Sequence, residues 1–364
     1  MKKTISSTFD LRNNSCTGFD YLRIGLSIFI VYWHCIWIST GSVELGKALW
    51  SGSFRFIPAA ILPMFFALSG FLIAGSLSRT KIHQFVALRI IRIVPALVFD
   101  TVFCALLLGP VITNLTLTDY FHSEKLYAYF LNILGIIHYQ LPGVFTNNIG
   151  SDNVNAQLWT IPFELECYLT IVILKICNIV NSRKNLIITF IIATIYLIYT
   201  QLHQAPLDKF THVPGRMLVL TFLAGILIFQ NSDKITLTKL NFFSALLVSI
   251  LCLQFYQLTY LAAFPIAYIT VYIGVQKFRK IPLGDLSYGL FLFHFPIGQT
   301  IIHFIPETKS INALFLMTLP ASCIIAWISW TFVEKPALSK KKNIIEYMDK
   351  TAKNWRSYFK LASK

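Results

Sequence analysis

The sequence predicts an all-α, polytopic integral membrane protein, and three observations support that fold class. Apolar residues make up 55% of the chain and charged residues only 13%, a composition too hydrophobic for a soluble domain. The apolar residues gather into segments of about 17–25 residues, the length that crosses a bilayer as a helix. Lysine and arginine concentrate between alternate segments, as they do in the cytoplasmic loops of membrane proteins.

About ten membrane-spanning helices are expected, with one possible re-entrant segment. We predict the spans near residues 22–40, 56–77, 93–113, 158–180, 185–202, 215–231, 241–256, 258–275, 286–305 and 312–333. The stretch 126–141 is apolar too, but Asn132, His138 and the following Pro142-Gly143 pair favour a re-entrant or surface segment over an eleventh span.

The charge distribution supports this number of spans independently. With both termini in the cytoplasm, the cytoplasmic segments hold 25 of the 31 lysines and arginines. The other six are Lys47, Arg55, Lys125, Lys209, Arg216 and Lys309. An eleventh span would move the later basic loops to the outer side, against the positive-inside rule. Topology and lipid contact thus explain the formal charge of +15, and no nucleic-acid partner is expected.

The first predicted span carries two ionisable residues, Arg23 near its start and His34 towards its middle. A helix turns about 100° per residue, so the steps from Arg23 to His34 return to within about 20° of the same face, roughly 16 Å further along the axis. Ionisable groups inside a bilayer are costly and usually functional. The structural alternative is that Arg23 anchors the helix at the membrane surface and that His34 links two helices.

Small residues cluster in the second predicted span, at Ser69, Gly70, Ala74 and Gly75. Small side chains let helices approach closely in lipid, so we expect a contact between helices there. No G-x-S-x-G pattern surrounds Ser69, and this serine is therefore not expected to act as a hydrolase nucleophile.

Two arginines, Arg89 and Arg92, stand in a basic segment from Arg79 that leads into the third predicted span. Their i, i+3 spacing places both on one helix face. Neighbouring guanidinium groups suit phosphates, which they can bind through paired hydrogen bonds. Basic residues at a cytoplasmic helix end are also what the positive-inside rule predicts without any ligand.

Several blocks of sequence follow one another in the order of a known family. Arg23 and His34 are followed by FFALSGFLI from Phe65, by the pair Arg89 and Arg92, and by LWTIPFELECYL from Leu158, which places an acid at Glu164. FLAGIL from Phe222, GDLSYGLFLFHFPI from Gly284 and FVEKPA from Phe332 complete the series. From Phe19 to Pro336 the chain thus resembles acyltransferase family 3, integral membrane enzymes that O-acetylate cell-envelope glycans.

The resemblance implies a membrane-embedded acyltransferase domain at residues 1–336 and a basic cytoplasmic tail at residues 337–364. It also implies a place in the bacterial cytoplasmic (inner) membrane. A lone membrane module of this kind is similar to the O-antigen, capsule and exopolysaccharide acetylases. The sequence departs from the family pattern at Pro162, where serine is frequent, at Glu166, where glutamine is common, and at Asp100, an acid within the third span.

For such an enzyme the expected donor is acetyl-CoA, which is made in the cytoplasm and carries several phosphates. Arg23, Arg89 and Arg92 would hold its nucleotide end, and the pantetheine arm would reach inward to His34. A neutral imidazole is the usual general base near pH 7, so His34 would deprotonate a sugar hydroxyl or would accept the acetyl group transiently. Glu164 would orient His34 or stabilise its charged form, unless it forms a structural ion pair with an arginine.

Four further residues are candidates for contact with the glycan acceptor. Trp159 and Tyr168 could stack on a sugar ring, although aromatic residues near helix ends also anchor helices at the membrane interface. His294 would line the substrate site or pack in the core. Arg216, at the outer start of a span, would hold an anionic glycan or would be a plain loop charge. The expected partners are therefore membrane lipid, acyl-CoA and an envelope glycan.

The sequence leaves two alternatives to this function open. Intramembrane arginine, histidine and glutamate also mark transport pathways, so a transporter or flippase of a lipid-linked glycan is the alternative from another class. The paired, broken helices that many transporters show are not evident in the sequence. The same enzyme could also use a succinyl or other acyl donor. The seven cysteines are scattered without the paired spacing of a zinc site, so no metal is expected.

Overall fold

The computed structural model describes residues 3–10, 16–41, 43–203, 213–281, 285–308 and 310–362, with the side chains at 9–10, 43–44, 47 and 352–362 excepted. Within these ranges the regular structure is helical, and Thr4 and Thr236 form an isolated β-bridge without any strand. The all-α fold class is therefore confirmed. Of the residues discussed above, Lys209, Gly284 and Lys309 lie outside the described ranges.

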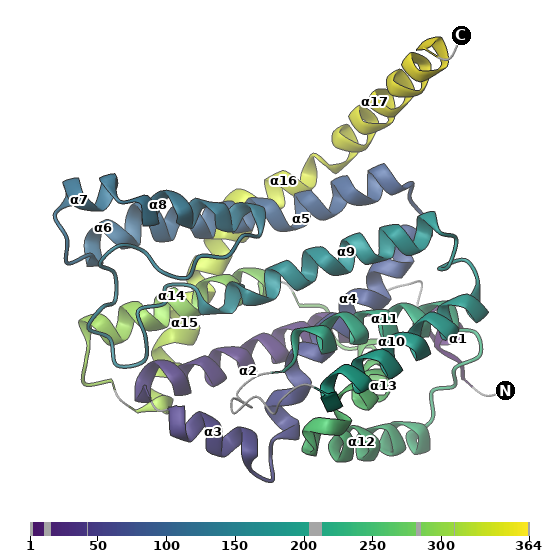
Figure 1. Cartoon of the computed structure of the whole chain (residues 1–364), viewed down its shortest axis with the longest axis horizontal. Coiled ribbons are helices and arrows are strands. Elements are labelled where there is room, and N and C mark those ends of the chain that lie inside the picture. The colour runs from purple at the N-terminus through teal and green to yellow at the C-terminus, as the bar shows by residue number, and fades with distance from the viewer. Residues whose placement is uncertain are drawn as a thin grey trace.

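Each of the ten predicted spans overlaps a helix (Figure 1). In chain order these are α2 (Gly18–Thr40), α4 (Phe56–Leu77), α5 (Ile82–Val102), α9 (Ile161–Ile176), α10 (Arg183–His203), α11 (Gly215–Gln230), α12 (Lys239–Gln254), α13 (Ala263–Gly274), α14 (Ser287–Phe304) and α15 (Ile311–Ser329). Six helical stretches in the described residues are long and apolar enough to cross a membrane, at 18–40, 56–77, 82–112, 183–203, 256–274 and 311–339. α11 and α12 are also apolar but shorter, at 16 residues each. The protein is therefore a multi-pass membrane protein.

The third span begins earlier than the predicted boundary at residue 93. α5 begins at Ile82 and continues through the π-helix η1 (Phe103–Leu108) into α6 (Gly109–Ile112). Arg89 and Arg92 therefore lie on a helix inside the bundle and not in a loop. Asp285, just before α14, compensates the charge of Arg92 there.

The apolar stretch 126–141 forms no spanning helix. It contains part of the short helix α8 (Glu124–Tyr129) and the 3-10 turn η2 (Phe130–Leu134), and it continues as irregular chain to η3 (Ala156–Thr160). Asn132 organises the turn, because its Nδ2 donates to the His138 carbonyl (2.9 Å) and its Oδ1 accepts from the His138 N–H (2.7 Å). Together with α7 (Leu117–His122), this segment occupies the left side of Figure 1.

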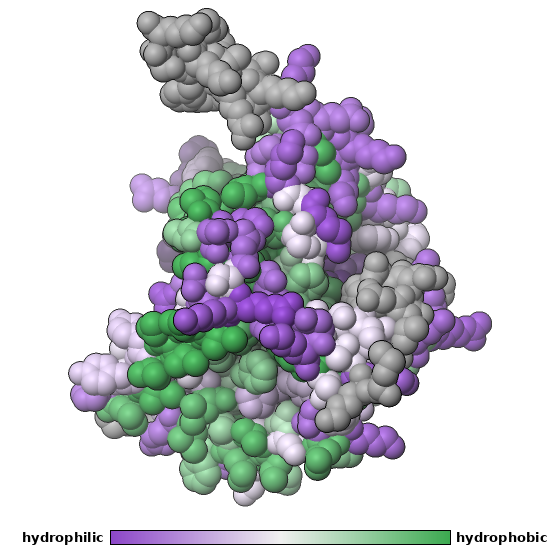
Figure 2. All heavy atoms as spheres, turned by 90° about the vertical axis from the view of Figure 1, so that its right-hand side faces the viewer, coloured by the Kyte–Doolittle hydropathy of each residue, from purple (hydrophilic) through white to green (hydrophobic). Residues whose placement is uncertain are grey.

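The loops that the charge pattern predicts to lie on the cytoplasmic side of the membrane lie together at one end of the bundle, which we call the basic end. Thr4 bridges Thr236 between α11 and α12, and the Gly18 N–H at the start of α2 donates to the Gln276 carbonyl after α13 (3.0 Å). The N-terminus and α17 (Lys341–Ala362) lie at this end, at the right of Figure 1. Figure 2, which faces it, shows hydrophilic residues spread over the surface beside exposed hydrophobic ones.

Helices α4 and α11 pack backbone against backbone. A Cβ atom added at Gly70 would lie 2.0 Å from the Phe222 carbonyl oxygen, and one added at Gly225 would lie 2.2 Å from the Ala67 carbonyl oxygen. Any larger residue at either position would push the helices apart. The expected helix contact at the small residues of the second span is therefore confirmed, and it holds the cavity-lining face of α4 in place.

The outer helices expose apolar side chains where lipid would cover them. Ile191, Ile192 and Ile195 of α10 are 49%, 62% and 62% exposed, and Leu247 and Leu251 of α12 are 59% and 52% exposed. Apolar patches of this kind are rare on soluble monomers. Their presence on two helices agrees with a protein whose solvent is the hydrocarbon of a bilayer.

Candidate active site

Two adjoining cavities lie inside the helix bundle. The basic cavity, of about 330 Å³, is lined by three arginines, Arg23 of α2 and Arg89 and Arg92 of α5. The tryptophan cavity, of about 360 Å³, is lined by His34 of α2 and by four tryptophans. Those tryptophans are Trp33, Trp37, Trp50 and Trp159. The residues that line both cavities are Leu62, Thr160 and Phe291.

A loop forms one wall of the tryptophan cavity at the end opposite the basic end. Gln299, near the end of α14, donates through Nε2 to the carbonyls of Ser151 (2.8 Å) and Asn153 (2.9 Å). Asn148 Nδ2 donates in turn to Gln299 Oε1 (2.9 Å). Ser151, Asn153 and Gln299 all line the cavity. One glutamine of α14 thus holds the loop that forms this wall.

His34 pairs with His294 of α14. Its Nδ1 lies 2.5 Å from His294 Nε2, and the two rings stack with centroids 4.8 Å apart and planes inclined by 10°. α2 and α14 are also joined nearer the basic end, where Ser27 Oγ donates to the Ser287 carbonyl (3.2 Å). Glu164, the expected partner of His34, lies instead in the wall of the basic cavity.

One backbone contact determines the proton positions in this histidine pair. His294 Nδ1 lies 3.1 Å from the carbonyl oxygen of Leu290, which can only accept, so this Nδ1 carries a proton. A neutral His294 then has a bare Nε2, and that nitrogen accepts the Nδ1–H of His34. Neutral His34 is left with a lone pair on Nε2. The pair therefore presents His34 as a base through the nitrogen that does not face His294.

Glu164 belongs to a second polar group, on the first turns of α9. The Tyr168 hydroxyl, one turn further along the helix, donates to Glu164 Oε1, a contact that the i, i+4 spacing allows. The Arg89 guanidinium lies beside Tyr168. All three side chains line the basic cavity. Glu164 and Tyr168, predicted for catalysis and for the acceptor, are therefore both neighbours of the arginines.

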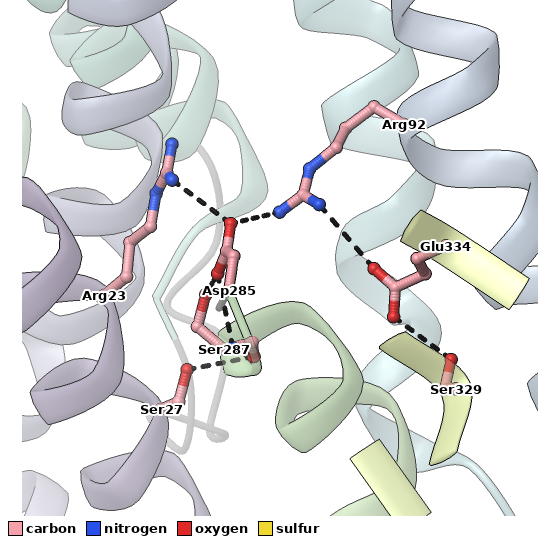
Figure 3. A network of polar contacts seen from close by, with 7 residues as sticks. All are labelled: Arg23, Ser27, Arg92, Asp285, Ser287, Ser329 and Glu334. Carbon is pink, nitrogen blue, oxygen red and sulfur yellow. Dashed lines mark hydrogen bonds and ion pairs between the residues drawn. The ribbon is translucent and has the colours of Figure 1, made fainter. Parts of the chain in front are cut away.

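Charged side chains join α2, α5 and α14 at the basic end (Figure 3). Arg92 Nη2 and Arg23 Nη1 both contact Asp285 Oδ2, at 2.5 Å and 3.3 Å. Arg92 Nη1 also lies 3.6 Å from Glu334 Oε2, and Ser329 Oγ donates to Glu334 Oε1 (3.1 Å). Two of the three arginines predicted to bind the donor are thus tied to carboxylates.

Asp285 stands just before α14 and fixes its start. Its Oδ1 accepts from the Ser287 N–H (3.3 Å) and from the Ser287 hydroxyl (2.5 Å). Burial by itself would raise the pKa of the Asp285 carboxyl, but Arg92 and Arg23 outweigh burial and hold that pKa below its ordinary value. Asp285 is therefore charged at neutral pH and compensates both arginines.

Arg89 differs from the other two arginines. In the described part of the chain, the ion pairs of this region involve Arg23 and Arg92 but not Arg89. Its Nε is buried and has no hydrogen-bond partner, and its guanidinium carbon lies 5.5 Å from the centre of the Phe85 ring. Arg89, which lines the basic cavity, thus keeps one buried N–H donor without a protein partner.

The two other residues predicted to contact the acceptor lie apart. Trp159 lines the tryptophan cavity. Arg216, at the start of α11, forms an ion pair with Glu166 of α9, and it is not among the described residues that line either cavity. The departure from the family pattern at Glu166 therefore has a structural counterpart, since this carboxylate compensates Arg216.

Asp100, another departure from the family pattern, is fully buried in α5. Asn155 Nδ2 donates to Asp100 Oδ2 (2.7 Å), and Gln157 Nε2 donates to the Leu292 carbonyl (2.5 Å). These two bonds tie the chain around η3 to α5 and to α14. Gln157 lines the tryptophan cavity. Asp100 therefore contributes to the wall of that cavity indirectly, by helping to hold η3 in place.

Four residues of this region were not candidates on sequence grounds. Asp285 and Glu334 lie in the blocks GDLSYGLFLFHFPI and FVEKPA, so the resemblance to the family could have identified them as candidates. Trp50 and Gln157 had no such signal, because neither stands in a quoted block. Contacts between distant segments of the chain bring Trp50 and Gln157 to the tryptophan cavity and bring Asp285 and Glu334 to the arginines of the basic cavity.

The arrangement can hold a polyanion and present a base in the adjoining cavity. The basic cavity offers cationic donors, and the tryptophan cavity offers aromatic walls with the lone pair of His34. Across the described residues, no group of three or more His, Cys, Asp or Glu side chains is placed to hold a metal ion. This combination suits transfer of a group from an anionic carrier to a neutral nucleophile.

Comparisons with known proteins identify the family. A family model described as an acyltransferase domain matches residues 17–334, a range that includes every cavity residue named above. An O-acetyl transferase of Shigella phage Sf6 is 24% identical over an alignment of 294 residues, and the match covers 76% of this chain and 84% of that protein. No solved structure matches the chain. The protein therefore belongs to the acyltransferase family whose sequence blocks it resembles.

Proposed function

We propose that the protein transfers an acetyl group from cytoplasmic acetyl-CoA to a hydroxyl of a cell-envelope glycan such as O-antigen, capsule or exopolysaccharide. One observation carries the proposal: His34, with its lone pair on Nε2, lines a cavity that adjoins another lined by three arginines. The family supports acyl transfer over the transport alternative. The phage relative is an O-acetyl transferase, which supports acetyl as the group and oxygen as its acceptor.

The basic cavity suits the nucleotide end of acetyl-CoA, which carries several phosphates. Arg89 would bind a phosphate through the donor that has no protein partner. Asp285 would hold Arg23 and Arg92 in fixed orientations beside it. Along α2 the rise from Arg23 to His34 is roughly 16 Å, comparable with an extended pantetheine arm. The arm would pass the residues that line both cavities and bring the thioester to His34.

In the transfer step His34 acts as the general base. Its Nε2 takes the proton of the acceptor hydroxyl while the hydroxyl oxygen bonds to the thioester carbonyl carbon. The C–S bond then breaks with its electron pair leaving on sulfur, and the sulfur takes the proton from His34 Nε2. The products are an acetyl ester and the CoA thiol. In the alternative route, Nε2 itself carries the acetyl group before the hydroxyl attacks.

Two neighbours would support this base and the donor. His294 keeps the Nδ1 proton of His34 engaged, which maintains the tautomer that the reaction needs. Glu164 and Tyr168 would act on the donor side, because their hydrogen bond forms next to Arg89 in the basic cavity. In this assignment Glu164 positions the donor site and does not touch His34.

The proposed site also gives the protein an orientation in the bacterial inner membrane. Acyl-CoA is cytoplasmic, so the basic end would face the cytoplasm, in agreement with the lysines and arginines concentrated in its loops. The glycan would then enter the tryptophan cavity from the opposite end. Both termini would be cytoplasmic.

Transfer of labelled acetyl groups tests the proposal. The purified protein in lipid nanodiscs is given acetyl-CoA with a labelled acetyl group and a glycan extract of the host envelope. We expect the label to enter the glycan as an alkali-labile ester while an equal amount of CoA thiol appears. Faster transfer from succinyl-CoA, identified by the mass of the product, would replace acetyl as the donor group. Movement of a lipid-linked glycan across the bilayer without turnover of any acyl-CoA would contradict the enzyme.

A further inference from the structure

We propose that the tryptophan cavity binds one uncharged sugar residue of the acceptor, with Trp50 and Gln157 as the side chains that recognise its hydroxyls. The inference rests on the proposed function, because it takes the acceptor to be a glycan. It goes further by naming the chemical class of the sugar and two residues that select it.

The walls of the cavity provide the apolar part of a sugar site. Trp33 and Trp50 meet edge to face, with ring centres 5.9 Å apart, and Trp37 and Trp159 line the same space. A pyranose ring has faces of C–H groups, which pack on the electron-rich faces of aromatic rings. Several tryptophans around one cavity therefore offer a sugar ring an apolar contact without any charge.

Two buried polar atoms in these walls have no protein partner. They are Trp50 Nε1, a donor, and Gln157 Oε1, an acceptor. Both side chains are almost completely buried, at 4% and 1% exposed, and both line the cavity. Buried polar groups are normally hydrogen-bonded, so these two call for an explanation.

The Gln157 amide is held in one orientation. Its other end, Nε2, donates to the carbonyl of Leu292 at 2.5 Å, and a carbonyl can only accept. The amide oxygen of Gln157 is therefore the end left over. Together Trp50 and Gln157 supply one donor and one acceptor, and a sugar hydroxyl both accepts and donates. Hydroxyls of a bound sugar would thus satisfy both atoms.

The charges around the cavity favour an uncharged ligand. None of the described residues that line it is a lysine, arginine, aspartate or glutamate. Arg55 lies near Trp50, but its guanidinium donates to the Leu253 carbonyl. Arg216 is paired with Glu166. Arg55 is not among the described residues that line the cavity, so a carboxylate on the sugar would lose its water there without a cation in the lining to replace it, which is costly.

The size of the cavity fits a single sugar residue. Its volume of about 360 Å³ stands near the lower end of the range of ~300–1,000 Å³ that small-molecule sites cover. The space next to His34 would therefore take the residue to be acetylated, and its neighbours in the glycan would stay outside the cavity.

Saturation-transfer NMR on the protein in nanodiscs tests the inference without any acetyl donor. The probes are methyl glycosides of glucose, galactose and mannose, each compared with the methyl glycoside of the corresponding uronic acid. We expect a neutral glycoside to bind and its uronic acid to bind about tenfold more weakly or not at all. Equal or tighter binding of the uronic acids would overturn the inference, as would failure of every neutral glycoside to bind.

Two variants test the residues by name. Trp50→Phe keeps an aromatic ring but removes the N–H, and Gln157→Leu removes the amide oxygen, so each should weaken binding of the neutral glycoside about fivefold or more. Trp327→Phe is the matched control for tryptophan, because Trp327 is 47% exposed on α15. Gln254→Leu is the matched control for glutamine, because Gln254 Oε1 is also buried and unpartnered but lies outside the lining of the cavity. Unchanged binding in Trp50→Phe would contradict the assignment.

Failure of this inference can be told apart from failure of the proposed function. Acetyl transfer from acetyl-CoA to an acidic sugar would keep the function and overturn the inference. Binding of neutral sugars that weakens in Trp50→Phe, in a protein that does not turn over acetyl-CoA, would keep the sugar site and overturn the function.

Discussion

The two cavities of this protein differ in the charge of the side chains that line them, although α2 contributes residues to both. At the basic end, α2 contributes Arg23, whose charge is compensated by Asp285. About three turns further on, the same helix contributes His34, which shares one proton with His294 in a neutral pair. Charged side chains thus line the basic cavity. The tryptophan cavity is lined instead by aromatic side chains and by a histidine whose hydrogen bond to His294 fixes its tautomer. A single face of α2 thus contributes an arginine to one cavity and a histidine to the other.

The difference shows how a membrane protein can keep reactive groups inside a bilayer. Isolated charges there are costly, and Arg23 and Arg92 avoid this cost because Asp285 and Glu334 are held against them. The histidine pair avoids the cost of a buried charge by staying neutral. It presents only the lone pair on His34 Nε2 to its surroundings. The basic cavity should therefore respond to changes of charge and the tryptophan cavity to changes of proton position.

The largest effect is expected from His34→Ala, which removes the base from the tryptophan cavity. Loss of general base catalysis typically lowers a rate by about 10²–10⁴-fold, and we expect a fall of that size in kcat for acetyl transfer. Binding of acetyl-CoA, measured by calorimetry, should not change, because the arginines remain. His203→Ala, on the exposed end of α10, is the control and should keep full activity. A His34→Ala variant with an intact rate would show that the base is elsewhere.

Arg89→Ala should affect the basic cavity and leave the other cavity unchanged. A hydrogen bond to a charged group contributes about 1.5–3 kcal/mol, so acetyl-CoA should bind roughly 10- to 100-fold more weakly. Methyl glycosides should bind as before. Arg183→Ala removes a guanidinium whose exposed ion pair with Asp233 lies at the same end, and it should change neither affinity. Equal weakening in both variants would reduce the role of Arg89 to general surface charge.

We expect His294 to act by fixing the tautomer of His34. The effect of a substitution at His294 should therefore depend on whether the new side chain can accept a hydrogen bond. His294→Leu removes the acceptor for the Nδ1–H of His34, and we expect kcat to fall about 10- to 100-fold, the usual cost of losing a group that orients a histidine, with little change in KM. In His294→Gln the side-chain oxygen can take the place of Nε2 and should restore part of the rate. A similar rate in both variants would indicate that His294 only fills space.

The smallest effect is expected from Asp285→Asn, measured as melting temperature against pH. The pKa of Asp285 is lowered in the folded protein, so its stabilising contribution is present above the unfolded pKa and disappears as pH falls through the folded one. Because its side chain is 25% exposed, we expect only about 1 kcal/mol near pH 7, a shift of a few degrees. The difference between wild type and variant should begin to shrink near the unfolded pKa of about 3.9 and should vanish below the lower pKa of the folded protein.

Asp233→Asn serves as the control for that measurement, because Asp233 forms an exposed ion pair with Arg183. We expect no measurable change in melting temperature at any pH. A difference between wild type and Asp285→Asn that grew as the pH fell would contradict the assignment of Asp285 as the charged partner of the arginines.

Local regularities of the sequence were enough to predict the helices and the spacing of two site residues. Each apolar segment of membrane length overlaps a helix, because a helix satisfies its own backbone hydrogen bonds wherever it lies in a bilayer. Six stretches of the described residues are long and apolar enough to cross a membrane, and the number of ten spans stays a prediction. The periodicity of one helix also placed Arg23 and His34 on a common face, and both line the cavities. The helix of the third span begins before the predicted boundary at residue 93, at Ile82.

Only the tertiary structure decided which residues meet. His34 and His294 are 260 positions apart, as are Ser27 and Ser287, and Asp285 joins arginines of α2 and α5. Such contacts depend on the rotation and tilt of packed helices, which close approaches such as that at Gly70 determine and which no periodicity of a single helix contains. The sequence by itself therefore determined the class of protein, the positions of its helices and the common face of Arg23 and His34. The packing of the helices placed Glu164 beside the arginines, gave His34 its histidine partner and brought Trp50 and Gln157 into one cavity.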